Sequence, residues 1–271
     1  MLTGSGPIRD TAFVSVVPTG RFIAALSDGA YNYSIVESDF DGGNQRVIAR
    51  NAFLPRVSVD GRIIVHVGSE VSNARLHFVE PDGSLRRITP ASTPLEAEAY
   101  GHMASDGWIY FSGKDAGGVF HLWRVRPDGS QAERLTNGFA EWRSWPSPDG
   151  SKLVFSKLVQ NTWETHVLDI ATRQVTSLHA IGLGPVWSAN GQRIAIPPDD
   201  GRFFQTVNAD GTNLQMVPNT EFAFSDSADW TADGANLIAR TRAGVELIRV
   251  NDGERLLLKF AENMHFPVRA P

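Results

Sequence analysis

The sequence predicts an all-β protein, a six-bladed β-propeller in which each blade is a sheet of four antiparallel strands. Three observations support this prediction. Asp-Gly and similar turns recur along the 271 residues. The first turn of each unit follows the previous one after 41 to 46 residues. No stretch keeps an amphipathic 3.6-residue period over the length of a helix. A period near 40 to 45 residues with four short strands is typical of propeller blades.

Two turns divide each unit. In Pro148-Asp149-Gly150 the proline presets φ, and aspartate and glycine tolerate the left-handed backbone of a tight turn. The other first turns are Thr19-Gly20, Asp60-Gly61, Asp106-Gly107, Asn190-Gly191 and Asp233-Gly234. The second turns are Asp41-Gly42, Asp82-Gly83, Asp128-Gly129, Asp210-Gly211 and Asp252-Gly253. The fourth unit has Asp169-Ile170-Ala171-Thr172 instead, which can still turn.

Short runs rich in β-branched and aromatic residues lie between these turns and predict strands. A first strand is expected before each first turn, as at Ala12–Val17 and Ala52–Val57. Second strands are expected at Arg21–Leu26, Ile63–Val67, Trp108–Phe111, Leu153–Phe155, Arg193–Ile196 and Leu237–Ala239. Third strands are expected at Tyr33–Val36, Leu76–Val79, Leu122–Val125, Thr165–Leu168, Phe203–Val207 and Val245–Val250. Fourth strands are expected at Arg46–Ala49, Leu85–Thr89, Ala132–Thr136, Gln174–Leu178, Leu214–Val217 and Arg255–Lys259.

One four-stranded sheet cannot bury both of its apolar faces alone, whereas blades packed side by side in a ring bury both. We therefore expect residues 1–271 to form a single propeller domain. Its repeats lie at about 11–50, 51–92, 93–137, 138–180, 181–220 and 221–262. Met264–Val268 is similar to the first strand at Ala52–Val57, so we expect segment 263–271 to close the seam between the first and last blades.

Composition excludes several classes of protein. The net charge of −5 comes from interspersed acidic and basic residues, so no basic stripe for nucleic acid is present. The absence of cysteine excludes disulfides and thiolate metal sites. The first residues lack the basic and apolar regions of a signal peptide, and no apolar run approaches the roughly 18 residues of a membrane span. We expect a monomer.

Particular segments connect the repeat to a known family. Pro185–Ile196 and Ser147–Phe155 follow the pattern P-x-W-S-P-D-G-x-x-I-A-F, and Leu122–Thr136 follows the second half of the unit. The chain resembles the TolB-like six-bladed propellers, whose repeat is also described as WD40-like or PD40, over roughly residues 11–259. None of the seven tryptophans is followed by aspartate, unlike the WD40 pattern. The resemblance implies a bacterial periplasmic, secreted or surface-attached binding scaffold, here without the N-terminal domain of TolB, and a cytoplasmic location stays open.

The turns also fix which side chains face the channel. Positions four residues before each first turn are mostly polar, and we expect them to line the channel, where they bind a ligand or pair with each other and with water. They are Ser15, Arg56, His102, Trp145, Val186 and Asp229. The next positions are apolar and predict inter-blade core. They are Val16, Val57, Met103, Pro146, Trp187 and Trp230.

Acidic residues precede several first strands and predict an acidic rim, which is either a site for a cation or basic peptide or simply a solvated edge. They are Glu96, Glu98, Glu141, Asp226 and Glu262. The combined candidates for ligand binding at the channel mouth are Arg56, Glu98, His102, Glu141, Arg143, Trp145, Asp229 and His265.

No catalytic signature is present: there is no G-x-S-x-G elbow, P-loop or dinucleotide fingerprint, and none of the seven histidines has metal-ligand spacing. We therefore predict no cofactor, no metal and no catalytic residue, and a propeller that binds a protein, a peptide or a glycan without catalysis. The alternative is a metal-dependent polysaccharide lyase of the oligogalacturonate type, which requires His102, His265 and Arg56 to converge. A third reading is a sensory or structural propeller from a larger chain.

Overall fold

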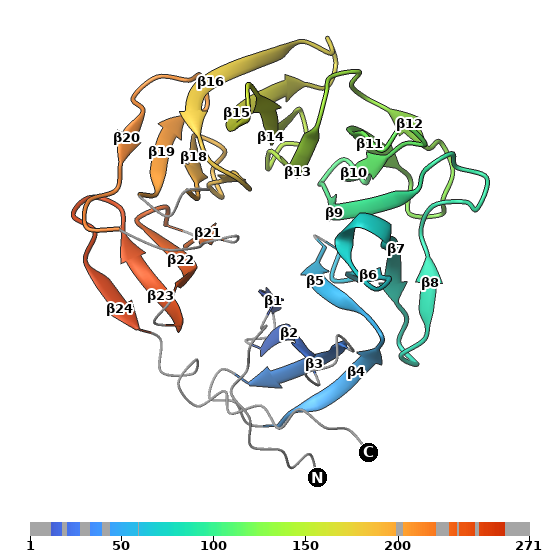
Figure 1. Cartoon of the computed structure of the whole chain (residues 1–271). Helices are drawn as coiled ribbons and strands as arrows, with labels where there is room; N and C mark the ends of the chain where they lie inside the picture. The colour runs from blue at the N-terminus through green and yellow to red at the C-terminus, as the bar shows by residue number, and fades with distance from the viewer. Residues whose placement is uncertain are drawn as a thin grey trace.

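The computed structural model describes residues 12–17, 21–27, 33–39, 44–58, 60–198, 203–220, 228–231, 233–241 and 244–257. These residues form six antiparallel sheets of four strands each, and every sheet is a meander whose strands pair in chain order. Figure 1 shows the sheets arranged as a ring, with the first strand of each nearest the centre and the fourth at the periphery. The prediction of a six-bladed propeller is confirmed.

The first three blades contain the following strands, together with a single 3₁₀ turn, η1 (Val71–Asn73): β1 (Ala12–Val17), β2 (Arg21–Ser27), β3 (Tyr33–Asp39), β4 (Arg46–Arg50), β5 (Phe53–Val57), β6 (Ile63–Val67), β7 (Arg75–Val79), β8 (Leu85–Arg87), β9 (Ala97–Met103), β10 (Ile109–Lys114), β11 (Phe120–Val125) and β12 (Glu133–Arg134). The last three contain β13 (Glu141–Pro146), β14 (Lys152–Val159), β15 (Thr162–Asp169), β16 (Val175–Ile181), β17 (Val186–Trp187), β18 (Arg193–Ile196), β19 (Gln205–Asn208), β20 (Gln215–Met216), β21 (Ala228–Trp230), β22 (Asn236–Thr241), β23 (Gly244–Arg249) and β24 (Arg255–Leu257).

The repeated turns have the backbone that the sequence predicts. Every described turn glycine has a positive φ, as at Gly61, Gly83, Gly107, Gly129, Gly150, Gly191, Gly211, Gly234 and Gly253. In the fourth blade the Gly150 N–H donates to the Ser147 carbonyl at 2.9 Å, while the Asp149 carboxylate accepts from the Ser147 hydroxyl at 2.6 Å. This is a tight turn closed by a left-handed glycine.

Two strands of the fourth blade are longer than the apolar pattern predicts. The pair β14–β15 continues to Val159 and Thr162 because Gln160 and Asn161 both take left-handed backbone, with φ of 46° and 67°. Two successive positive φ values make the primed turn that matches the twist of a hairpin. The second turn of the same blade has no glycine, and Arg173, with φ of 61°, takes the left-handed position.

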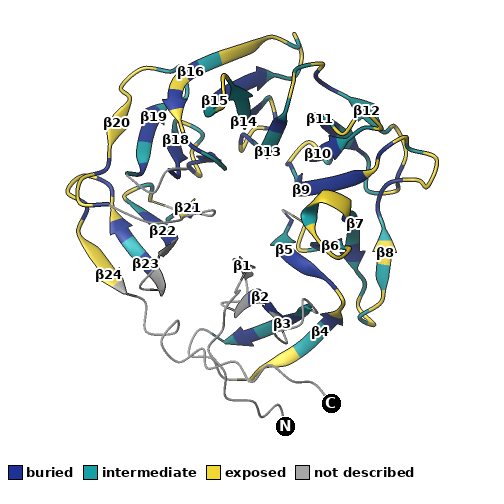
Figure 2. Ribbon diagram, viewed as in Figure 1, coloured by how far each residue is buried: buried dark blue, intermediate teal, exposed yellow. Residues whose placement is uncertain are grey.

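The core lies between neighbouring blades. Tyr110 and Leu122 of the third blade, for example, share one buried cluster with Leu153 and Phe155 of the fourth. Figure 2 shows the same trend, with buried residues concentrated in the middle strands and exposed ones along the outer strands. Such clusters join each blade to the next from the first to the sixth, so both faces of the second to fifth sheets are buried by adjacent blades. Burial of these faces favours closing the ring.

Two tryptophans confirm the predicted inter-blade positions. Trp187 and Trp230 are 5% and 7% exposed. The indole of Trp187 donates to the Trp145 carbonyl at 3.1 Å, and that of Trp230 donates to the Val186 carbonyl at 3.3 Å. Each ring is thus buried against the preceding blade, and its polar N–H is paired there.

The predicted seam segment 263–271 lies outside the described residues, so its pairing stays a prediction. Across the part of the chain that the structure describes, no helix is long and apolar enough to cross a membrane.

Gly61 and Gly129 provide a matched test of blade packing, because their φ values are 83° and 84°. A Cβ on Gly61 would meet nothing within 4 Å, whereas one on Gly129 would lie 2.8 Å from the Ile88 carbonyl of the preceding blade. Gly61→Ala should lower the free energy of unfolding by about 1 kcal/mol, the cost of left-handed backbone. Gly129→Ala should lower the free energy of unfolding by a further ~1–3 kcal/mol because of the clash. Urea unfolding measures both, and equal losses would contradict close contact between that turn and its neighbour.

Candidate functional site

A pocket lies where the innermost strands of five blades meet. Its lining residues come from β5, β9, β13, the loop before β17 together with β17 itself, and β21. Arg56, His102, Trp145 and Val186 are among them, so four of the six predicted channel positions line one pocket. Tyr100 and Arg143 also line it. The cavity volume is about 20 Å³.

Three of these side chains stack on one another. The guanidinium carbon of Arg56 lies 5.2 Å from the centre of the Trp145 ring. The imidazole of His102 lies against the same indole, with ring centres 4.0 Å apart. They come from three consecutive blades, and the register from each turn brings them together. The aromatic contacts hold the cation in a fixed orientation.

A repeated β-bulge aims the pocket residues. Leu54, Tyr100 and Arg143 have φ of 50°, 55° and 52°, and each lies where the pairing of β5, β9 or β13 shifts register. Each stands two residues before Arg56, His102 or Trp145. Gly184, with φ of 81°, stands two residues before Val186. A bulge changes the direction of the side chains that follow it, so this backbone turns these residues toward the pocket.

His66 supports one of these bulges. The backbone N–H of Tyr100 donates to the His66 Nε2 at 2.8 Å. The guanidinium carbon of Arg143 then lies 5.0 Å from the Tyr100 ring centre. His66 thus acts as a positioning residue for a pocket wall. This role could not be predicted from the sequence, because nothing about a histidine in the middle of β6 indicates that it contacts a bulge in the next blade.

The electrostatics of the described pocket favour an anion. Burial lowers the pKa of His102 well below its ordinary value, and the charge of Arg56 lowers it further, so the imidazole is neutral near pH 7. Asp229 is exposed on β21, yet desolvation by the protein around it raises its pKa, against the opposing effects of the Trp230 N–H and Arg56. Arg56 and Arg143 supply the positive charge.

The predicted acidic rim is wrong for Glu98 and Glu141, which are 0% and 1% exposed. Glu98 accepts the Leu76 N–H at 3.0 Å and the hydroxyl of Thr89. Its Oε1 also lies 3.5 Å from Arg87 and 3.9 Å from Arg75. Both carboxyls therefore lie within the blade interfaces, where hydrogen bonds and charges compensate their burial.

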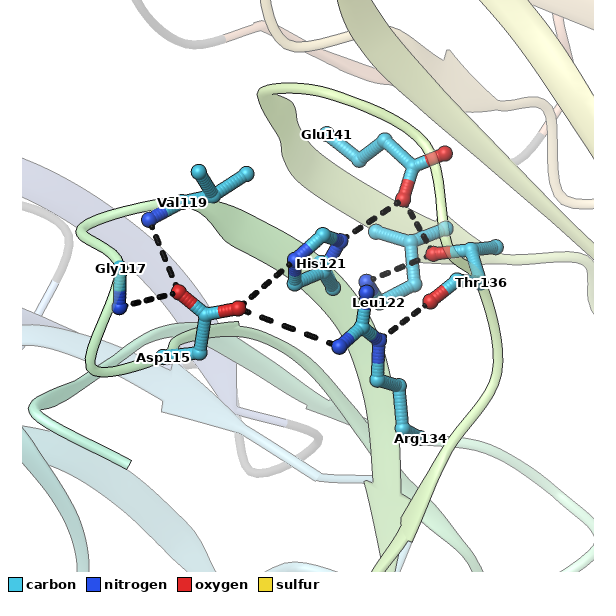
Figure 3. A network of polar contacts seen from close by, with 8 residues as sticks. All are labelled: Asp115, Gly117, Val119, His121, Leu122, Arg134, Thr136 and Glu141. Atoms are coloured by element: carbon cyan, nitrogen blue, oxygen red, sulfur yellow. Dashed lines mark hydrogen bonds and ion pairs between the residues drawn. The ribbon is translucent and has the colours of Figure 1, made fainter. Parts of the chain in front are cut away.

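Glu141 repeats this arrangement one blade later. It accepts the Thr136 hydroxyl, whose oxygen in turn accepts the Leu122 N–H at 3.0 Å. Figure 3 shows the same carboxylate beside His121, whose Nδ1 lies 3.7 Å from it and whose Nε2 lies 3.1 Å from Asp115. In each case an acid at the start of an innermost strand binds a threonine at the end of the preceding blade. We call this pairing the acid–threonine clasp.

The other predicted acidic and histidine residues are placed as follows. Glu96 is exposed and lies 3.5 Å from Lys114. Asp226, Glu262 and His265 lie outside the described residues, so the predicted approach of His265 to His102 stays a prediction. Within the described ranges, no three His, Asp or Glu side chains gather as a set that could hold a metal ion.

The chain has the fold of TolB-like six-bladed β-propellers. Solved structures with this fold include a putative TolB from Agrobacterium tumefaciens, with 17% identity and a TM-score of 0.68, covering 79% of this chain and 84% of that one. TolB from Acinetobacter baumannii has 17% identity and a TM-score of 0.71, covering 88% and 63%. An oligogalacturonate lyase in complex with manganese has 12% identity and a TM-score of 0.62, covering 89% and 74%. Likeness at these identities shows the fold alone.

Among curated proteins, the uncharacterized protein Atu1656 of Agrobacterium fabrum (strain C58 / ATCC 33970) is 31% identical over 119 residues. The match covers 42% of this chain and 39% of that protein, so less than half of either is aligned. No protein-family model matches the sequence.

The clasp makes a prediction about stability. Glu98→Ala should lower the free energy of unfolding by about 3 kcal/mol or more, because it leaves the Leu76 N–H and the Thr89 hydroxyl unpaired in the blade interface. Glu96→Ala is the matched control two residues away, and its single exposed ion pair predicts a loss of less than about 0.5 kcal/mol. Chemical unfolding measures both variants, and a Glu98→Ala protein as stable as the control would contradict the clasp.

The buried histidines predict a pH dependence. Burial lowers the pKa of His66 to about 3, so the folded protein keeps this imidazole neutral while the unfolded chain binds a proton below about pH 6.5. The unfolded state then binds more protons, and stability should fall with decreasing pH by up to ~1.4 kcal/mol per pH unit for this residue. Unfolding free energies between pH 7.5 and 5 measure the slope. His66→Gln, which keeps an acceptor for the Tyr100 N–H, should reduce it; an unchanged slope would contradict the prediction.

Proposed function

We propose that this propeller is a non-enzymatic binding protein whose channel pocket recognises an acidic segment of a protein or peptide partner. The observation that carries the proposal is the convergence of Arg56 and Arg143, each against an aromatic ring, in one pocket. A guanidinium that stacks through its face binds carboxylates through its N–H edge, often in bidentate fashion. The neutral state of His102 avoids a third charge that would repel the two cations.

The size of the pocket favours a carboxylate group over a sugar ring. The cavity volume of about 20 Å³ has room for about one water molecule. A carboxylate group is closer to this size than a pyranose ring. The expectation of a basic partner depended on Glu98 and Glu141 forming an exposed rim, and it is abandoned because both are buried.

The similarity in fold to TolB proteins supports a binding role in the general sense that a propeller presents a rigid channel to partners. We extend to this chain the expectation of a periplasmic or secreted location and of a monomer that binds neither nucleic acid nor membrane. A glycan was also predicted from the sequence as a possible partner, and the binding test below includes a glycan to distinguish this case.

The alternative activity is a polysaccharide lyase, since an oligogalacturonate lyase in complex with manganese has the same fold. In such a lyase Arg56 would pair with the carboxylate of a uronate. His102 would be one ligand of the metal, and His265, outside the described residues, would be another. Metal analysis together with ultraviolet absorbance of an unsaturated product from oligogalacturonate tests this activity. Turnover that depends on metal would replace the binding proposal.

The binding proposal predicts charge-dependent affinity. An acetylated and amidated peptide with two aspartates in a Gly-Ser background should bind the protein at low salt, and the same peptide with asparagines should bind far more weakly. Arg143→Gln and Arg56→Gln should each weaken binding of the aspartate peptide about tenfold or more, because each removes a charge-assisted hydrogen-bond donor. Isothermal titration calorimetry measures these affinities.

Arg46→Gln is the control for this experiment. Its side chain is 69% exposed on the outermost strand β4 and pairs with Glu37 at 2.7 Å, far along the blade from the pocket. It changes the net charge by the same amount, so it should leave the affinity unchanged. Equal effects of all three substitutions would indicate non-specific electrostatic attraction and would refute recognition in the pocket. Binding of trigalacturonate but not of the peptides would assign a glycan to the site.

A further inference from the structure

A second concave site lies beside the channel pocket, between the third and fourth blades. We call it the aromatic groove, and it is lined by Gly118, Val119, Phe120, Phe139, Ala140, Trp142 and Trp163. These residues come from the β10–β11 loop, the β12–β13 loop and the starts of β11, β13 and β15. The groove has a volume of about 100 Å³. It is therefore roomier than the pocket at the centre of the ring.

Polar contacts fix one wall of the groove. The Asp115 carboxylate accepts the N–H groups of Gly117 at 2.9 Å and Val119 at 3.1 Å, and its other oxygen lies 3.1 Å from His121. Figure 3 shows this carboxylate closing the loop while His121 reaches across to Glu141. Glu141 immediately precedes Trp142, which forms the opposite wall. The same network thus sets both walls before any ligand arrives.

Ring contacts hold the aromatic lining in place. The Phe120 and Trp142 rings are 4.1 Å apart and nearly perpendicular, at 76°. Phe139 at the edge is 63% exposed. A rigid apolar depression next to an exposed aromatic ring gains free energy when an apolar group covers it.

The lining selects the chemistry of the occupant. Every side chain that lines the groove is apolar apart from the indole N–H groups, so it offers few partners for the hydroxyls of a sugar. Its volume is below the ~150 Å³ of a cavity that holds benzene in another protein, which suits one aliphatic side chain. An amino-acid side chain of a partner fits these limits better than a glycan.

The groove and the pocket are neighbours along β13. Trp142 lines the groove, and the next residue, Arg143, lines the pocket. The Tyr100 ring connects them, since it lies 5.1 Å from the Trp142 ring and 5.0 Å from the Arg143 guanidinium. A ligand that enters both sites thus meets an apolar surface and a positive charge one residue apart on the same strand.

We propose that the aromatic groove receives an aliphatic side chain of an extended segment of a protein partner, whose nearby acidic residue enters the channel pocket. The inference rests on the proposed function and specifies the partner sequence as an apolar residue close to an acidic one. Residues of an extended chain are spaced by about 3.3 Å, so the two should lie one to three positions apart.

The test uses acetylated and amidated octapeptides in a Gly-Ser background. Each carries two aspartates and one leucine placed one to three positions before or after them, and matched peptides carry alanine in place of leucine or asparagine in place of aspartate. For at least one placement, leucine should raise the affinity for the wild-type protein about tenfold or more, as expected for burial of one aliphatic side chain. Isothermal titration calorimetry measures each affinity.

Phe139→Ser and Trp163→Ala should abolish the gain from leucine and leave the affinity of the alanine peptides unchanged. Met216→Ser is the control, because Met216 is 67% exposed on the outer strand β20. Phe139 is itself exposed, so its substitution should leave the thermal unfolding temperature unchanged. This variant therefore keeps the test valid if Trp163→Ala proves unstable.

The outcomes separate this inference from the proposed function. If aspartate peptides bind through Arg143 but leucine adds nothing in any placement, the pocket binds acids and the groove proposal is wrong. If leucine adds affinity that Phe139→Ser and Trp163→Ala both leave intact, the groove proposal is also wrong. If leucine adds affinity equally to aspartate and asparagine peptides, and Arg143→Gln changes nothing, the joint site is refuted together with the acidic-segment function.

Discussion

The innermost strands of this propeller depend on a left-handed residue two positions before each described pocket position in blades two to five. Leu54, Tyr100, Arg143 and Gly184 take this role. The three that are not glycine each carry a backbone cost of about 1 kcal/mol or more, which the packing of the blades must offset. Without the bulge, alternation along the strand would send the following side chains to the other face of the sheet. The pocket therefore depends on backbone conformation in the sheet, rather than on loops.

The bulges also explain why residues of neighbouring blades hold the pocket residues in position. A bulge leaves a backbone N–H outside the regular ladder, and in the third blade the His66 imidazole of the second accepts it. A neutral acceptor is required there, which agrees with the strongly lowered pKa of His66. The geometry of Tyr100, and through it that of Arg143, thus depends on a side chain that never contacts the pocket.

Local turn chemistry explains why the fold could be predicted from the sequence. The turns at Gly61 and Gly150 need a residue with left-handed φ, and glycine adopts it most easily. This requirement depends only on the turn itself, so the repeat can be recognised in the sequence without knowledge of the tertiary structure. The same turns fix the register of the strand before them, which placed Arg56, His102, Trp145 and Val186 in one pocket. The number of residues between a turn and a strand position therefore predicts which side chains face the pocket.

The rest of the site could not be predicted, because it depends on contacts between blades. Glu98 and Glu141 carry charges that hydropathy assigns to solvent, and contacts that include a threonine of the preceding blade compensate their burial. Arg143 was a candidate only for its position near Trp145. Its contact with Tyr100 arises from two bulges in different sheets. The aromatic groove likewise combines three segments whose apolar residues have no shared period.

The acid–threonine clasp has a consequence for how such a ring can change in evolution. In the third blade Glu98 lies at the start of the sheet and Thr136 follows its last strand, so this blade carries one half of a contact at each end. Duplication or deletion of the whole repeat would therefore place a threonine beside a carboxylate at each new junction. An exchange that removes only one end of the repeat would leave a buried carboxylate without its threonine, so the repeat tolerates gain or loss of whole blades better than changes to part of one.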